Sequence, residues 1–216
     1  MPRCRRVFVQ WFLAVGFIGC TGNPHPGDPR PANSRPGDPG DEKPNPVDSM
    51  PVLLDLNGAP VDPLAKSEAS AMVFLFTRTD CPISNRYAPE VRRLHERFHP
   101  LGVEFYLVYV DPEETVERIH AHLRDYNYPC PALLDPKHKL VQRTGASVTP
   151  EAALFSRDKT LVYVGRIDDW YVDFGKSRAA PSTHELTDAI VDTLEGKLVS
   201  VPRVPAIGCY ISDLRD

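Results

Sequence analysis

The chain has 216 residues, and its 25 lysine and arginine residues against 29 aspartate and glutamate residues leave a formal net charge of -4. This balance argues against a nucleic-acid-binding protein, which carries a basic surplus. Apolar residues make up 42% of the chain and charged residues 25%, which excludes a multi-span membrane protein, a wholly disordered chain and a small disulfide-rich scaffold.

The first 19 residues have the order of an export signal. Three arginines precede an apolar run over residues 7–18, which is shorter than the roughly 20 residues that a membrane-spanning helix needs. The run ends in Phe17-Ile18-Gly19-Cys20, which resembles the lipobox of bacterial lipoproteins, although phenylalanine stands where leucine is usual. The resemblance implies a lipid on Cys20, and the alternative is a simple secretory signal that happens to contain a cysteine.

Residues 20–50 are rich in proline and glycine. Eight prolines and four glycines fall between Thr21 and Met50, with almost no large apolar side chains. Such a segment cannot bury enough apolar surface to offset the entropy of ordering it. The composition predicts a disordered, semi-extended spacer between an anchor and a folded domain.

Apolar runs predict the first strands of that domain. We expect a strand over residues 52–56, which the Asn57-Gly58 turn signal ends. Continuous apolar runs over residues 71–77 and 103–110 are typical of strands that are buried on both faces of a parallel sheet.

Helical periodicity follows each of the two buried runs. One apolar face recurs at spacings of three and four residues through Ile83, Tyr87, Val91, Leu94 and Phe98. A second face contains Val116, Ile119, Leu123 and Tyr126, and we expect Asp111 to cap its helix.

The remaining segments complete an alternating pattern. We expect a short strand over 132–134, a short helix over 137–144, and an antiparallel pair of strands over 152–155 and 161–165. Ser182 and Glu185 predict a capping box for a last helix through Leu194. The order β-β-α-β-α-β-α-β-β-α predicts one α/β sandwich domain over residues 51–198, followed by a tail over 199–216 that contains Cys209.

One cysteine lies where a reactive thiol is expected. Cys81 follows the buried strand 71–77 and begins a helix, so its sulfur should lie beyond the carboxyl end of that strand. Free amides and the dipole at a helix N-terminus stabilise a thiolate.

Three motifs around this cysteine resemble those of the thioredoxin superfamily. Cys81-Pro82-Ile83-Ser84 occupies the place of the C-x-x-C motif, Pro89 that of the helix-kinking proline, and Val148-Thr149-Pro150 that of the cis-proline that faces the active cysteine. The resemblance covers residues 51–196. It implies a thioredoxin-like fold, in which helices flank a central mixed β-sheet, and site positions at Cys81, Ser84, Thr149 and Pro150.

Within that superfamily, the chain is similar to the redoxin branch, the peroxiredoxin-like group of alkyl hydroperoxide reductase and thiol-specific antioxidant. The similarity rests on the extra strand 132–134 with the residues that follow it, on 163–169 and on 206–209. Two departures matter. Arg78 and Phe74 stand where peroxidatic enzymes have a threonine or serine and a proline, and Ser84 replaces the second cysteine of thioredoxin-type reductases.

A C-x-x-S site needs a resolving thiol from elsewhere. Cys130 should enter a parallel strand at the end opposite Cys81, and a strand of six residues rises about 20 Å, so we interpret Cys130 as buried and unreactive. The tail could bring Cys209 to the site. For Cys209 three interpretations stay open: a resolving cysteine, a non-catalytic cysteine, and a disulfide with Cys130.

The roles of other polar residues near the motif stay open. Ser84 either donates a hydrogen bond to the thiolate or only replaces the missing cysteine, and Arg78 and Arg86 would lower the pKa of the thiol while Asp80 would raise it. His120 and His122 share one predicted helix but lie about 200° apart around its axis, which argues against a shared metal.

Two classes of function fit these observations. The first is a redox enzyme that uses Cys81 as its nucleophile: a thiol-disulfide oxidoreductase, or alternatively a peroxiredoxin-like thiol peroxidase. It would act on protein or small-molecule thiols and disulfides, or on peroxides. The second class is a non-catalytic redoxin-fold binding or chaperone module. We expect no cofactor, no metal and no nucleic-acid partner. We expect export to the bacterial cell envelope, with the lipid on Cys20 in a membrane and the domain in the periplasm or otherwise outside the cytoplasmic membrane.

Overall fold

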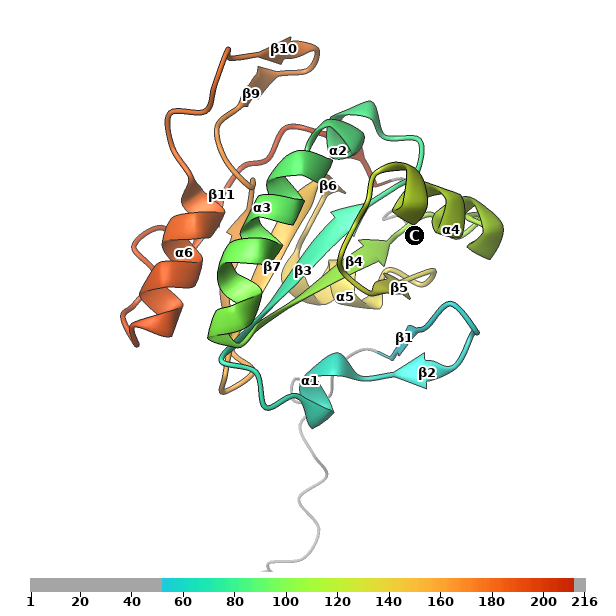
Figure 1. The fold of residues 1–216 in the computed structure, drawn as a ribbon, viewed down its shortest axis with the longest axis horizontal. Coiled ribbons are helices and arrows are strands. Elements are labelled where there is room, and N and C mark those ends of the chain that lie inside the picture. Colours follow the sequence, from blue (N-terminus) through green and yellow to red (C-terminus); the bar gives the residue numbers. More distant parts are fainter. Residues whose placement is uncertain (1–51, 212–216) are drawn as a thin grey trace, which may run out of the picture. The chain divides into compact units, whose positions relative to one another are not determined.

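A computed structural model describes residues 52–211 of the chain (Figure 1). The predicted signal segment 1–19, the predicted lipid attachment site Cys20 and the predicted spacer 20–50 lie outside the described residues. None of the helices within 52–211 combines the length and the apolar character that crossing a bilayer requires.

A mixed sheet of eight strands forms the centre of the described region, and β3, β4 and β5 run parallel in it. In spatial order its strands are β11 (Arg203–Val204), β8 (Leu161–Gly165), β7 (Glu151–Ser156), β3 (Ala71–Thr77), β4 (Val103–Tyr109), β5 (Ala132–Leu134), β1 (Leu53–Leu54) and β2 (Pro60–Val61). β7 pairs antiparallel with both β3 and β8. This arrangement confirms the predicted thioredoxin-like α/β fold.

Two further pairs of short strands lie outside the central sheet. β9 (Tyr171–Asp173) and β10 (Lys176–Ser177) form one hairpin. β6 (Val148–Thr149) pairs antiparallel with β12 (Cys209–Tyr210), which comes from the end of the described chain. The second pair is important for the site.

Helices cover both faces of the sheet (Figure 1). They are α1 (Pro63–Lys66), α2 (Pro82–Arg86), α3 (Ala88–Phe98), α4 (Val116–Asp125), α5 (Lys139–Thr144) and α6 (Glu185–Leu194), with a 3₁₀ turn, η1 (His99–Leu101), after α3. Alternate residues of β3 point to opposite faces. Val73 and Leu75 pack with residues of α2, α3, α4 and α6, whereas Phe74 and Phe76 pack with residues of α1 and α5.

The predicted helix over 83–98 is two helices. α2 ends at Arg86, and α3 begins at Ala88 with Pro89 in its first turn. Proline has no N–H to donate and fits the first turn of a helix, where no intrahelical acceptor is needed. Pro89 therefore marks the start of a second helix.

Both predicted N-terminal caps are wrong. α4 begins at Val116 and its cap is Thr115, whose hydroxyl accepts from the Arg118 N–H at 3.3 Å, while Asp111 accepts from the Glu113 N–H at 3.0 Å in the preceding turn.

The residues of the expected capping box have tertiary partners instead. Ser182 bonds to Asp169, and Glu185 pairs with Arg166. α6 begins at Glu185 without a side-chain cap. Both side chains bond to residues that are distant in the sequence, and a local motif cannot anticipate such partners.

The segment after α6 is attached to the domain at residues 203–204 and 209–211. Residues 203–204 form β11, an edge strand parallel to β8. The Arg203 guanidinium donates to the Thr144 carbonyl at 2.7 Å, and the Ile211 N–H donates to the Ser147 carbonyl at 3.0 Å. These contacts hold the chain on both sides of Cys209.

Replacing Phe74 tests the core on the α5 side of the sheet. Phe74 is fully buried, stacked on Tyr106 and edge-on to Phe155. We expect Phe74→Ala to lower the free energy of unfolding by about 3–5 kcal/mol. Phe174→Ala is the matched control, because Phe174 is 65% exposed, and it should change stability by less than about 0.5 kcal/mol. Urea denaturation measures both, and equal effects would contradict the packing described.

Candidate functional site: a dithiol at the carboxyl end of β3

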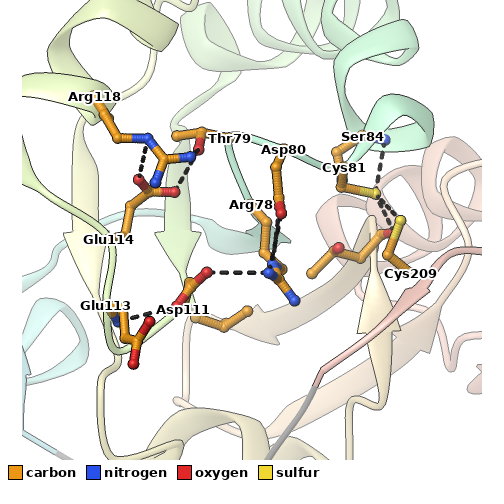
Figure 2. A network of polar contacts seen from close by, with 12 residues as sticks. Arg78, Thr79, Asp80, Cys81, Ser84, Asp111, Glu113, Glu114, Arg118 and Cys209 are labelled. Atoms are coloured by element: carbon orange, nitrogen blue, oxygen red, sulfur yellow. Dashed lines mark hydrogen bonds and ion pairs between the residues drawn. The ribbon is translucent and has the colours of Figure 1, made fainter.

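Cys81 caps the helix that follows β3. Its backbone is extended, its side chain lies at the N-terminus of α2, and the Ser84 N–H donates to Sγ at 3.5 Å (Figure 2). The side chain is nearly inaccessible, with 1% of the residue exposed. The predicted place of this thiol, beyond the carboxyl end of a buried strand at a helix start, is thus the observed one.

The predicted proline loop faces Cys81. The Thr149–Pro150 peptide bond is cis, and the Cys81 thiol lies 3.0 Å from the Thr149 carbonyl oxygen, to which its S–H can donate. The hydroxyls of Ser84 and Thr149 are buried and have no conventional hydrogen-bond partner among the described residues. Their protons are therefore free to turn toward a thiolate at Cys81. The structure brings Ser84, Thr149 and Pro150 together at this cysteine.

Cys209 completes the site from the far end of the chain. β12 sets Cys209 opposite Thr149 in the antiparallel pair, and its Sγ lies 2.8 Å from Cys81 Sγ (Figure 2). Both residues are free thiols. Of the three interpretations that the sequence left open, this geometry favours a pair with Cys81.

Gly208 lets the tail approach this closely. A Cβ at this position would lie 2.2 Å from the Thr149 carbonyl oxygen and 2.7 Å from its carbon, both of which are backbone atoms. Any other residue would force β12 away from β6.

Cys130 is not part of the site. β5 pairs Ala132 with Leu107, which itself pairs with Leu75, so Cys130 lies near the middle of the sheet and Cys81 beyond its end. Burial raises the pKa of the Cys130 thiol to about 12. The structure supports the prediction that this thiol is unreactive.

The two site thiols have opposite pKa shifts. Burial raises the pKa of Cys81, but hydrogen bonds from Cys209, Ser84 and Thr149 outweigh it, so the pKa lies below the ordinary value. Burial and the hydrogen bond to Cys81 raise the pKa of Cys209 to about 12. The first proton therefore leaves Cys81, and Cys209 remains a thiol that can donate to the thiolate.

Ion pairs neutralise much of the charge beside the thiols. Arg78 lies between Asp80 and Asp111, with nitrogen–oxygen distances of 3.1 Å to each (Figure 2). Arg86 is exposed and donates to the Tyr171 hydroxyl at 3.2 Å. The pKa of Cys81 is lowered chiefly by hydrogen bonds rather than by a free cationic side chain.

One group of residues within 52–211 could hold a metal ion. Ligand atoms of Glu90, Asp168 and His184 lie within 4.8 Å of one another. Arg93 already pairs with Glu90, and Asp168 accepts hydrogen bonds from the Tyr87 hydroxyl and the Trp170 N–H. These existing contacts explain the cluster without a metal.

The family assignment follows from a comparison of the sequence with protein families. Residues 49–164 match the AhpC/TSA family, and the match spans more than half of the chain. The chain belongs to this family. No curated protein matches the sequence.

Solved structures share the fold of this AhpC/TSA protein. A hypothetical protein from Sinorhizobium meliloti 1021 matches at 26% identity and a TM-score of 0.64, covering 76% of this chain and 91% of that one. An uncharacterized conserved protein from Geobacillus kaustophilus matches at 26% identity and a TM-score of 0.65, covering 78% and 95%. DsbF of Mycobacterium tuberculosis, at 17% identity and a TM-score of 0.51, covers 68% and 98%, and at this identity the likeness concerns the fold alone.

The roles of Gly208 and His122 were not predicted from the sequence. Gly208 lies in the predicted tail 199–216, and nothing in its local sequence signals that its neighbour is the Thr149 carbonyl. His122 was considered only as a metal ligand, although it follows the buried Ile119 at a helical spacing of three. That spacing is the signal that could have placed it on the inner face.

Gly208→Ala tests the close approach of the tail. The added Cβ should displace β12 at a cost of about 1–3 kcal/mol, which lowers the equilibrium constant for a Cys81–Cys209 disulfide by at least about fivefold. Titration against glutathione redox buffers, with alkylation and mass analysis, measures this constant. Tyr210→Ala, in the same strand but 81% exposed, is the control and should leave it unchanged. Equal constants for Gly208→Ala and the unaltered protein would contradict the contact.

Proposed function

We propose that the protein is a thiol-disulfide oxidoreductase in which Cys81 is the nucleophile and Cys209 the resolving thiol. The observation that supports this most directly is the pair of sulfur atoms 2.8 Å apart, one on a thiol with a lowered pKa and the other on a thiol that keeps its proton. Membership of the AhpC/TSA family is in keeping with chemistry at a cysteine.

The proposed cycle needs the two thiols, a substrate disulfide and an external dithiol as reductant. The Cys81 thiolate attacks one substrate sulfur, and the other leaves as a thiolate that takes up a proton. Cys209 loses its proton and attacks Cys81 Sγ in the mixed disulfide, releasing the second substrate thiol. The substrate gains two electrons, the protein holds a Cys81–Cys209 disulfide, and an external dithiol returns it to the starting state.

Burial of Cys81 sets a condition on this cycle. With β12 in place Cys81 is covered and Cys209 is only half-buried, so a disulfide in solution meets Cys209 first. We infer that β12 lifts from β6 before Cys81 attacks a bulky substrate. Its return then delivers Cys209 to the mixed disulfide.

The alternative substrate is a peroxide, which would react with the same thiolate. The family takes part of its name from alkyl hydroperoxide reductase. Position 78, where peroxidatic enzymes have threonine or serine, is an arginine already paired with Asp80 and Asp111. The environment of Cys81 therefore favours disulfide exchange, and peroxide is the comparison substrate in the test below.

The export signal completes the proposal. We propose that residues 1–19 direct export, that Cys20 carries a lipid, and that residues 20–50 separate the domain from the surface of a membrane in the bacterial cell envelope. In a bacterial host, Cys20→Ala should move the protein from the membrane fraction to the soluble fraction and abolish incorporation of labelled palmitate. Cys4→Ala is the control and should change neither. Unaltered fractionation of Cys20→Ala would contradict the anchor.

Three serine variants test the assignment of the thiols. Cys81→Ser should abolish reduction of a peptide disulfide by dithiothreitol-recycled protein, because the nucleophile is gone. In a single turnover without dithiothreitol, Cys209→Ser should accumulate a mixed disulfide between Cys81 and the peptide, because no second thiol of the protein resolves it. Cys130→Ser should retain full activity. Absorbance of the released thiols and intact mass measure turnover and the adduct.

The same assays separate the alternatives. If hydrogen peroxide oxidises the Cys81 thiol faster than the peptide disulfide does, the protein is a thiol peroxidase. A binding module would be indicated by two results together: the unaltered protein does not reduce the peptide disulfide, and Cys81→Ser binds the peptide with unchanged affinity. Either result overturns the proposed activity.

Thiolate absorbance at 240 nm tests the hydrogen bond from Cys209. Cys209→Ser keeps a hydroxyl donor near Cys81, whereas Cys209→Ala removes the donor. The pKa of Cys81 should therefore be higher in Cys209→Ala than in Cys209→Ser, so that less thiolate is present at pH 7. Equal titration curves for the two variants would contradict the assigned donor.

A further inference from the structure

A hydrogen-bonded chain of polar side chains, buried at Tyr109 and His122 and half-buried at Asn85, joins β4, α4 and α2 and is not used by the chemistry above. Its centre is His122 on α4, which is 5% exposed. His122 Nδ1 lies 2.8 Å from the Tyr109 hydroxyl, and Nε2 lies 2.8 Å from Asn85 Oδ1. The Asn85 side-chain NH₂ donates in turn to the Thr79 carbonyl at 3.0 Å.

The donors and acceptors of this chain assign the form of His122. The Asn85 NH₂ is used on Thr79, so Asn85 presents its oxygen to His122 and Nε2 must carry a proton. In the neutral ring Nδ1 then accepts from the Tyr109 hydroxyl. Burial lowers the pKa of His122, although Glu114 and Asp125 oppose the shift.

At its Asn85 end, this hydrogen-bonded chain contacts the backbone on both sides of Cys81. Thr79 precedes Cys81 by two residues, and Asn85 follows it by four and donates its backbone N–H to the Cys81 carbonyl at 3.0 Å. Asn85 thus ties the loop that enters α2 to the first turn of α2. That turn supplies the Ser84 N–H that donates to the thiol.

We propose that His122 is a positioning residue for Cys81: through Asn85 it fixes the loop at Thr79 against α2 and so keeps the thiol at the N-terminus of that helix. This role for His122 rests on the proposed function, in which Cys81 is the nucleophile. The hydrogen bonds that join His122, Asn85 and Thr79 do not depend on that function. Without His122, the Asn85 oxygen loses its partner and the side chain is free to release Thr79.

The test is the titration of Cys81 in a double-mutant cycle, followed by absorbance at 240 nm with Cys81→Ser subtracted. His122→Phe and Asn85→Leu should each raise the pKa of Cys81, so that the thiolate fraction at pH 7 falls roughly three- to tenfold. The double variant should show no larger fall than either single variant, because both remove one connection. His120→Phe, an exposed position on the same helix, is the matched control and should leave the titration unchanged.

His122→Gln keeps the inference testable if the phenylalanine variant does not fold. Its carboxamide can still donate to Asn85, so the titration should move back toward that of the unaltered protein. Unchanged titration in folded His122→Phe and Asn85→Leu, multiplicative effects in the double variant, or an equal effect of His120→Phe would overturn the assignment. The titration needs no substrate, so absence of turnover bears on the proposed function and leaves this test intact.

Discussion

The antiparallel pairing of β12 with β6 is the constraint on which the site depends. It places Cys209 opposite Thr149, and this brings Cys209 Sγ into contact with Cys81 Sγ. Hydrogen bonds between backbone groups need no particular side chain, but the approach needs Gly208, since a Cβ there would overlap the Thr149 carbonyl. A backbone requirement at one glycine thus determines whether the C-x-x-S motif has a second thiol.

The same pairing couples access to reactivity. β12 covers Cys81 and donates one of the hydrogen bonds that lower its pKa, so the thiolate is most favoured when it is least exposed. Lifting β12 would expose the nucleophile and remove a hydrogen bond that stabilises its thiolate. The proposed cycle follows from this coupling, because the strand that must move for the first attack carries the thiol that completes the second.

The fold and half of the site could be predicted from local patterns. Buried strands read as apolar runs, and Cys81, Thr149 and Pro150 follow motifs a few residues long. Cys209 could only be left open, because it lies 128 residues from Cys81 and β12 is too short to show a strand pattern. The caps at Asp111 and Ser182 were wrong for a related reason: turn and tertiary partners compete with helix capping for the same side chains. His122 was missed because its partners belong to α2 and β4.

Peptide mapping under non-reducing conditions after mild oxidation tests whether Cys209 is the thiol partner of Cys81. Full-length protein oxidised by a slight excess of glutathione disulfide is alkylated, digested and analysed by mass spectrometry. We expect a cross-linked peptide that joins Cys81 to Cys209, with Cys130 alkylated only after unfolding. A free Cys209 beside a glutathione adduct on Cys81, or a cross-link between Cys130 and Cys209, would contradict it.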